Sequence, residues 1–212
     1  MNRRDLHPIA FFNEWFTEPF DVRDYSVAGI VDALNRHPIA ADQSAQDYVM
    51  PHRRCREHAG RFRIYGENQD VYYCFVYEGD ESKTDPPVYF ESCLDLNIDY
   101  GIKQSDIING DHVLVADRFT TFLWQVLGHH ICLRMESGGL FSNAVTGIVF
   151  KDNLELDNSF INPLGRDFPA GYTCFLSDSE ICIPDWGAAF LTALSRESFM
   201  TRYSPHVSRE WA

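Results

Sequence analysis

The side chains most able to bind a metal are histidine and cysteine, and the sequence contains eight histidines and six cysteines. His129 and His130 are adjacent, so on a helix their side chains diverge by about 100° and cannot easily bind one ion. Cys55 and His58 are three residues apart and could share a helix face. A zinc site needs more ligands than this pair. We therefore expect no metal site and no cofactor.

Catalysis by other means has no local signature in the sequence. No G-x-S-x-G, H-E-x-x-H, P-loop or G-x-G-x-x-G pattern is present. Carboxylates are abundant, but their separation in space cannot be deduced from their positions in the chain. We expect a protein that is not an enzyme, and a hydrolase with paired carboxylates in a cleft remains the alternative.

The charge of the chain bears directly on its partners. Thirty-one acidic residues outnumber eighteen Lys and Arg, which gives a formal net charge of -13. A nucleic acid or an anionic membrane needs basic residues to replace its counterions, so neither is expected as a partner. Between Ile64 and Asp111 there are eleven acidic residues and only two lysines. This region would attract a basic partner, or it serves as a solvated acidic surface.

Composition places the chain among soluble globular proteins. Its 212 residues are 45% hydrophobic and 23% charged, which allows one sizeable core without disulfides or metals. The apolar run from Ile9 to Phe12 is too short for an export signal or a membrane span. The irregular spacing of the cysteines favours reduced, buried thiols in a cytoplasmic protein. They are Cys55, Cys74, Cys93, Cys132, Cys174 and Cys182.

The amino-terminal half alternates helix and strand patterns. Ser26 can cap a helix in which Val27, Ile30, Val31 and Leu34 share one face. The segment RFRIY alternates apolar and basic residues, and DVYYCFVYE is rich in β-branched and aromatic residues. With YGENQD as the turn between them, these two segments predict a β-hairpin.

Two consecutive prolines follow the hairpin. Pro86 and Pro87 force the chain into an extended conformation and supply no N–H donors. The predicted third strand, Val88 to Phe90, should therefore be entered from a sheet edge or a strand end. Such a pair can also be a polyproline ligand, but that recognition usually needs a longer exposed run.

Further elements are predicted in the carboxy-terminal half. HVLVA indicates a strand, and Asp117 can cap the amphipathic helix that follows it. AVTGIVFK indicates another strand, and a second capped helix is expected after Asp185, with Phe190, Leu191 and Leu194 on one face. Together the patterns predict an α+β fold with a central mixed, largely antiparallel sheet flanked by helices.

An ordered series of motifs resembles the SUKH superfamily of bacterial immunity proteins, which also includes the fungal Smi/Knr cell-wall regulators. The series covers about residues 45–130 and consists of DYVMP (Asp47 to Pro51), GRFRIYGENQDVYYCFV (Gly60 to Val76), DPPVYFES (Asp85 to Ser92) and the helix RFTTFLWQVL (Arg118 to Leu127). The order and spacing are more specific than any one motif. The resemblance implies one SUKH-like α+β domain over residues 1–212, with residues 138–212 as an added subdomain or a continuation of the same sheet.

The resemblance also implies a function. Proteins of this group are binding modules, and bacterial members neutralise cognate polymorphic toxins, often nucleases, by direct contact. The acidic surface is compatible with a basic toxin as partner, and a regulatory or scaffold module is the alternative. Candidate partner-binding residues are the motif residues and nearby acids Glu67, Gln69, Asp80, Glu81, Asp85, Glu91, Asp95 and Asp99. For Glu67, Gln69 and Asp85 a turn-forming role is the competing interpretation.

Overall fold

A computed structural model describes residues 6–40, 47–133, 140–169 and 173–211. By its contacts the chain divides into two compact units. The first, here called the terminal unit, comprises Met1–Pro19, Leu123–Asp167 and Tyr172–Ala212. The second, the motif unit, comprises Phe20–Phe122 and Phe168–Gly171. Helices and antiparallel strands occur in both, so the predicted α+β class is confirmed.

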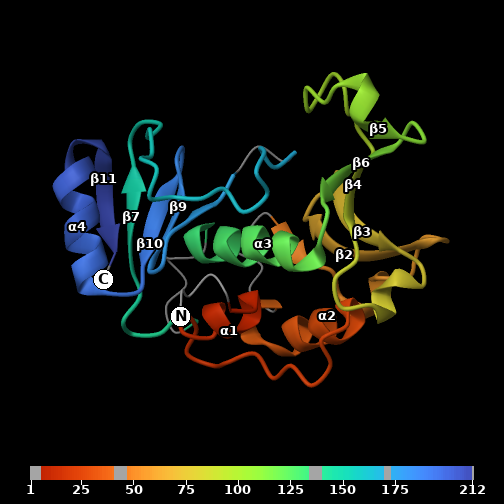
Figure 1. The fold of residues 1–212 in the computed structure, drawn as a ribbon, viewed down its shortest axis with the longest axis horizontal. Coiled ribbons are helices and arrows are strands. Elements are labelled where there is room, and N and C mark those ends of the chain that lie inside the picture. Colours follow the sequence, from red (N-terminus) through yellow and green to blue (C-terminus); the bar gives the residue numbers. More distant parts are fainter. Residues whose placement is uncertain (1–5, 41–46, 134–139, 170–172, 212) are drawn as a thin grey trace. The chain divides into compact units, whose positions relative to one another are not determined.

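Among the described residues, one α-helix lies wholly within the motif unit, together with a six-stranded sheet. The sheet order is β1-β2-β3-β4-β6-β5, and its pairings are antiparallel. The elements are α2 (Val27–Arg36), β1 (Asp47–Val49), β2 (Arg61–Glu67), β3 (Tyr72–Tyr77), β4 (Val88–Ser92), β5 (Ile107–Ile108) and β6 (His112–Ala116). Figure 1 shows that the chain leaves this sheet after β4 and returns through β5 to β6.

The predicted β2–β3 hairpin is present, but its turn is shorter than expected. Tyr65 and Gly66 belong to strand β2 and pair with Cys74 and Tyr73. A Cβ at Gly66 would lie 2.9 Å from Cδ1 of Tyr73, so glycine here admits the neighbouring tyrosine ring. The glycine in YGENQD therefore marks a close side-chain approach within a strand, and the turn begins after Glu67.

The strand after the two prolines is also confirmed. Val88–Ser92 pairs with β3 on one side and with β6 on the other. Pro86 and Pro87 lie outside the ladder, before its first residue. Val88 and Phe90 are fully buried on the core face. Although β4 is an internal strand, the missing donors therefore cost it no ladder hydrogen bonds.

Helix α2 forms as its capping and spacing predict. The Ser26 hydroxyl accepts a hydrogen bond from the N–H of Gly29 at 3.1 Å. Val27, Ile30, Val31 and Leu34 are all buried. A serine cap and one apolar face thus suffice to define this helix.

Helix α3 (Phe119–Leu133) begins one residue later than expected, and its cap was wrongly predicted. Asp117 is exposed and precedes the helix. The acceptor at this helix start is Asp85, whose carboxylate takes the N–H of Thr120 at 2.7 Å. Arg118 also donates to Asp85, at 2.6 Å. A distant side chain replaced the local one, which no local pattern could reveal.

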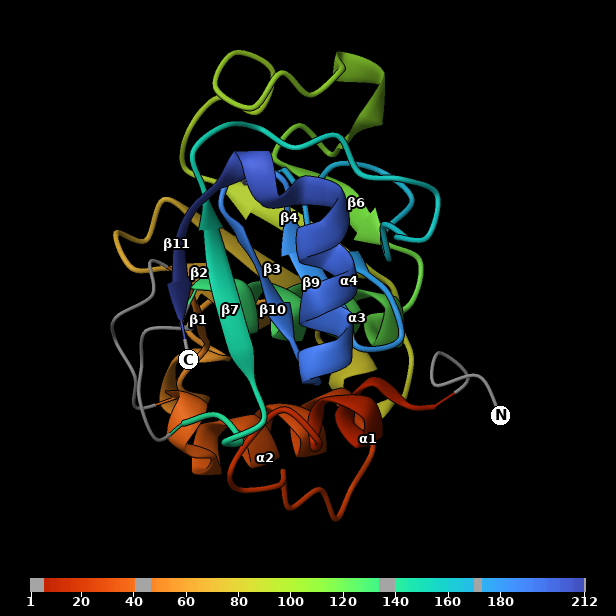
Figure 2. The ribbon, with the colours of Figure 1, turned by 90° about the vertical axis from the view of Figure 1, so that its left-hand side faces the viewer.

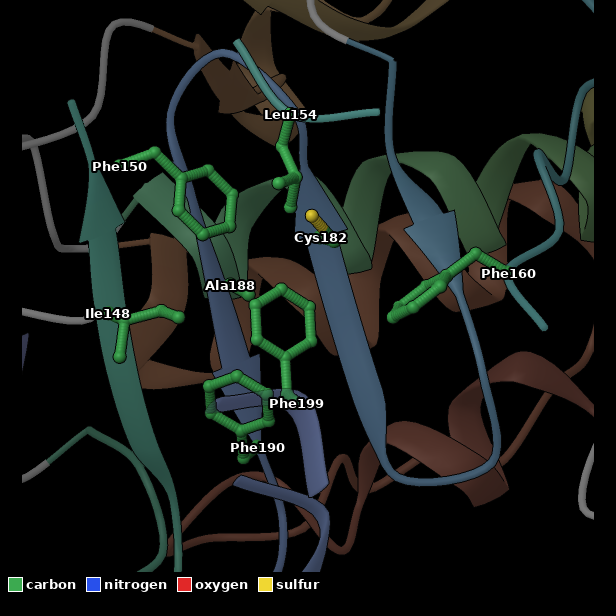
Figure 3. Close-up of a cluster of buried hydrophobic side chains, with 8 residues drawn as sticks. All are labelled: Ile148, Phe150, Leu154, Phe160, Cys182, Ala188, Phe190 and Phe199. Atoms are coloured by element: carbon green, nitrogen blue, oxygen red, sulfur yellow. The ribbon is translucent and has the colours of Figure 1, made fainter. Parts of the chain in front are cut away.

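The terminal unit has its own antiparallel sheet, of order β11-β7-β10-β9-β8. The elements that lie wholly within it are α1 (Pro8–Phe12), β7 (Thr146–Phe150), β8 (Phe175–Leu176), β9 (Glu180–Ile183), β10 (Gly187–Phe190), α4 (Ala193–Tyr203) and β11 (Val207–Trp211). Helix α4 lies over β7 and β10 (Figure 2). Its Phe199 enters a buried cluster that includes Phe150, Phe160 and Phe190 (Figure 3).

The helix predicted after Asp185 is wrong over its first half. Gly187–Phe190 is a strand, buried along its whole length between β7 and β9. Helix α4 begins only at Ala193, where the Thr192 hydroxyl accepts from the N–H of Ser195 at 3.1 Å. Leu194, expected on the buried face, is 75% exposed. Sheet pairing on both sides overrode the helical pattern of this segment.

The six cysteines are free thiols, of which five are buried and Cys93 is exposed. Within the described ranges, no helix combines the length and apolar character needed to cross a bilayer. Most of residues 138–212 fall in the terminal unit, and whether the two units fold as one domain stays a prediction.

Candidate binding segment and tyrosine face

Four of the eight predicted binding residues hold the motif unit together. Glu67 accepts the N–H of Gln69 at 2.8 Å and shapes the turn after β2. Glu81 pairs with Arg56 at 2.6 Å, and Asp85 caps helix α3. Burial opposes ionisation of Glu81, but the ion pair with Arg56 outweighs it and holds the pKa of this carboxyl below its ordinary value.

Glu91 is the fourth of these residues, and it is buried in an ion-pair network. Its carboxylate binds Arg63 at 2.8 Å and also pairs with Arg61. Arg63 in turn lies over the ring of Tyr73, with 3.6 Å between the guanidinium carbon and the ring centroid. Because both charges are withdrawn from water, each depends on the other for compensation.

The other four predicted residues lie at or near the surface. Gln69, Asp95 and Asp99 are exposed, and Asp80 is half-buried beside Lys83. Asp95 and Asp99 lie together, because Asp99 accepts the backbone N–H of Asp95 at 2.9 Å. Asp95 itself accepts from the N–H groups of Asn97 and Ile98. These two acids form a compact turn, while Gln69 and Asp80 belong to other loops.

This turn is part of the acidic segment, defined as Cys93–Asp111, which connects β4 to β6 through β5 (Figure 1). The segment is anchored by Leu96, which is buried, and by Tyr100, whose ring meets Phe90 at 5.3 Å between centroids. Leu94 and Ile98 are 45% and 80% exposed. The acidic segment therefore displays apolar side chains among carboxylates.

A second surface, which the sequence did not reveal, is the sheet face opposite the core of the motif unit. Strand alternation and ring contacts place Arg61, Arg63, Tyr73, Phe75, Tyr77, Tyr89, Glu91 and His112 on it. We call this surface the tyrosine face. Tyr77 and Tyr89 are half-buried, and their ring centroids are 4.9 Å apart.

A hydrogen-bonded series runs through the tyrosine face from Asp111 to His112 to Tyr77. Asp111 Oδ1 binds Nδ1 of His112, and Nε2 of His112 lies 2.9 Å from the Tyr77 hydroxyl. Asp111 also receives an ion pair from Arg61. Burial opposes ionisation of Asp111, but its bonds to Arg61 and His112 outweigh that effect and lower the pKa of its carboxyl.

Local sequence accounts for the position of the acid in this series. Asn109 and Gly110 both have positive φ, of 53° and 83°, and they turn the chain between β5 and β6. Asp111 follows this turn, and His112 is the first residue of β6. The Asn-Gly pair before Asp111 and His112 could have predicted this turn from the sequence. It could not have predicted the partner of His112, because Tyr77 lies on a strand 35 residues away.

Within the described ranges, no group of three or more His, Cys, Asp or Glu residues is arranged to hold a metal ion. His129 and His130 are buried in helix α3. Burial lowers the pKa of His129 to about 4, so this imidazole is neutral near pH 7.

Comparisons with known proteins add no identification. No family model matches the chain, and neither the curated proteins nor the solved structures contain a match. The geometry of the acidic segment and of the tyrosine face is therefore the basis for the proposals that follow.

Proposed function

We propose that this chain is an immunity-type binding protein that neutralises a cognate toxin protein by direct contact, and that the toxin is basic. The observation that carries the proposal is the acidic segment, which presents Leu94 and Ile98 beside Asp95 and Asp99. Apolar contact supplies affinity, and carboxylates around it select a partner of opposite charge. The motif series that resembles SUKH immunity proteins lies in the same unit.

The charge of the acidic segment supports a basic partner. It contains Asp95, Asp99, Asp106 and Asp111 but only one base, Lys103. Asp111 is engaged with Arg61, whereas the other three acids have no ion pair among the described residues. Unpaired surface carboxylates raise the local concentration of a cationic partner and speed its association. Rapid capture is an advantage when the partner is lethal to the cell.

The apolar side chains of the segment support a protein partner. Ile98 is the most exposed of the large hydrophobic side chains in the described residues, at 80%. Leu94 lies four positions earlier, on the other side of the buried anchor Leu96. Single exposed apolar residues are normal on protein surfaces, but here two lie within five residues of one acidic segment, where one partner would bury both.

The first test is biological. The chain is co-expressed with the product of the gene adjacent to its own, and growth and co-purification are measured. We expect the neighbouring product to arrest growth alone, to be harmless with this chain, and to co-purify in a one-to-one complex. A neighbouring product that still arrests growth and does not co-purify would reject the immunity function. Several weak partners instead of one would favour a regulatory module.

The second test locates the contact. Asp95, Asp99 and Asp106 are replaced together by asparagine, which keeps the hydrogen-bond acceptors of the turn and removes the charge. We expect the association rate constant to fall about tenfold at low ionic strength, and by less at high salt. Surface plasmon resonance over a salt series measures this change. An unchanged association rate would remove the acidic segment from consideration.

Matched controls exist in the terminal unit. Leu194 is exposed to 75%, close to the 80% of Ile98, so Leu194→Ala is compared with Ile98→Ala. We expect faster dissociation only for Ile98→Ala. Glu155, Asp185 and Glu197, three exposed acids, are replaced together by their amides to control for the loss of three charges. Equal effects of both members of either pair would contradict a contact through the acidic segment.

A further inference from the structure

We propose that Tyr77 is a histidine-activated nucleophile, and that its hydroxyl accepts an acyl group from activated carboxylic esters in a stoichiometric modification of the tyrosine face. His112 is the general base of this reaction, and Asp111 is a positioning residue. This inference does not depend on the proposed toxin partner, because it concerns a covalent reaction of Tyr77, although Asp111 is also the last residue of the acidic segment.

The geometry of the three side chains carries the proposal. The Tyr77 oxygen and His112 Nε2 are 2.9 Å apart, which is within the range for direct proton transfer. The opposite ring nitrogen, Nδ1, contacts the carboxylate of Asp111. A nucleophile bonded to a base, with the base oriented by a third group, is the arrangement that activates side-chain hydroxyls.

The tautomer of His112 follows from its partners. An ionised carboxylate can only accept a hydrogen bond, so Nδ1 of His112 carries the proton that Asp111 accepts. Nε2 of the neutral ring is then an acceptor, and the Tyr77 hydroxyl donates to it. His112 is 1% exposed, so the protein and not water provides its hydrogen-bond partners.

The reaction balances without an added oxidant or reductant. The Tyr77 oxygen attacks the ester carbonyl carbon while its proton passes to Nε2 of His112. The bond between the carbonyl carbon and the leaving alkoxide or phenoxide breaks, and a new ester bond joins the acyl group to Tyr77. The leaving group then takes a proton from His112 or leaves as an anion, in which case the proton goes to solvent.

Charged groups on the surrounding strands lie around His112. Asp111 contacts the ring directly, and Glu91 on β4 lies opposite His112 in the strand register. Arg61 on β2 bears the opposite charge, but it is paired with both of these carboxylates. Asp111 is therefore the charged group in direct contact with the His112 ring.

Tyr89 on the same face is the natural comparison. Its ring centroid is 4.9 Å from that of Tyr77 and 5.6 Å from that of His112, and it is also half-buried. No hydrogen bond of its hydroxyl is found among the described residues. Burial raises the pKa of Tyr89, which disfavours ionisation of its hydroxyl. Both rings contact His112, but only the Tyr77 hydroxyl is hydrogen-bonded to Nε2 of this histidine.

The experiment uses 4-nitrophenyl acetate as the acyl donor and the full chain as the acceptor. Release of nitrophenolate is followed by absorbance, and the acetylated residue is located by peptide mass spectrometry. We expect one acetyl group on Tyr77 and a rate that rises with pH, because a general base must be unprotonated to accept the tyrosine proton. That rise should end well below the pH near 10 at which an ordinary tyrosine ionises.

Four variants test the roles. Tyr77→Phe should abolish the rapid acetylation, and Tyr89→Phe should leave it unchanged. His112→Gln should slow it by about 10²-fold, the usual contribution of a general base. Asp111 is largely exposed, so Asp111→Asn tests its positioning role without emptying a buried site. It should slow the reaction by about tenfold and displace the pH profile.

The outcomes separate activation from mere proximity. Two results would overturn the proposal. One is acetylation spread equally over Tyr77 and Tyr89. The other is an unchanged rate in Asp111→Asn, provided that the thermal unfolding of this variant matches that of the parent. A pH profile that rises only near pH 10 would overturn it as well, because it would show an ordinary tyrosine.

Discussion

At the scale of single residues, the buried acids of this protein serve its fold more than its surface. Glu91 lies within 2.8 Å of Arg63, and both side chains are more than nine-tenths buried. Removing one partner of such a pair leaves the other charge buried without compensation. An acid that looked like a surface contact in the sequence is therefore a structural requirement of the sheet.

This argument makes a prediction for Glu91→Gln. We expect the variant to lose about 3 kcal/mol of its free energy of unfolding, because Arg63 then keeps its charge without a counterion. Urea denaturation followed by circular dichroism measures the change. Asp21 pairs with Arg23 at 2.8 Å but both are largely exposed, so Asp21→Asn is the control and should leave the urea midpoint unchanged. Equal midpoints for the two variants would contradict a buried, dependent pair.

Asp85 allows a second prediction at this scale. Asp85→Ala removes the acceptor for the N–H of Thr120 and should cost about 1 kcal/mol of unfolding free energy. Asp85→Asn keeps an acceptor oxygen and should cost less. Chemical denaturation of both variants separates the cap from the charge. If Asp117→Ala proved more destabilising than Asp85→Ala, the local residue would be the cap after all.

At the scale of elements, the packing of helix α3 depends on Gly128, although glycine has a low helix propensity. In the terminal unit, a Cβ at Gly128 would lie 2.5 Å from Sγ of Cys174 and 3.3 Å from Cγ2 of Ile181. Glycine thus lets the helix backbone approach the strands closely. Helix propensity alone would favour alanine here by about 1 kcal/mol.

We therefore expect Gly128→Ala to destabilise the protein, because overpacking costs about 1–3 kcal/mol and exceeds the gain in propensity. Thermal and urea unfolding measure the net effect. In a Cys174→Ala background the nearest obstructing atom is gone, so the same substitution should become nearly neutral or stabilising. A stabilised Gly128→Ala in the parent chain would show that the helix and strands are not in close contact at this point.

At the scale of the whole molecule, the carboxylates determine how stability depends on pH. Asp85 and Glu81 have pKa values below their ordinary values of 3.8 and 4.5, since hydrogen bonds and arginines outweigh the opposing effect of burial. The unfolded chain therefore takes up protons at a higher pH than the folded protein. Stability from these groups is fully present above about pH 4.5 and is lost as the pH falls through their folded pKa values.

We predict that the free energy of unfolding decreases from about pH 5 toward about pH 3, as measured by urea titrations across this range. Asp85→Asn should flatten that slope, because one of the linked groups is removed. Glu180 acts in the opposite direction, since burial raises its pKa. Glu180→Gln should therefore steepen the acid-side loss, and a steeper slope in Asp85→Asn would contradict the linkage.

The parts of the fold that sequence predicted share a physical reason. Each of them depends on residues close together in the chain. Helix α2 depends on its serine cap, the β2–β3 hairpin on alternating residues, and strand β4 on the two prolines without N–H donors before it. The acidic character of the segment that includes Asp95 and Asp99 is also local. Composition and spacing contain such information directly.

Errors arose where a partner distant in the chain decided the outcome. Gly187–Phe190 has a helical pattern but is a strand, because β7 and β9 flank it on both sides. Asp85 replaced Asp117 as the helix cap from more than thirty positions away. The sheet of the motif unit likewise joined Tyr77 to His112.

By itself, then, the sequence determined the α+β class, several secondary-structure elements and the strongly acidic balance, since all of these depend on local composition and periodicity. Only the tertiary structure decided which acids are buried as ion pairs and which, like Asp95 and Asp99, remain on the surface. Burial depends on strand register and on contacts between distant segments, and a one-residue change of register would reverse the face on which every side chain lies.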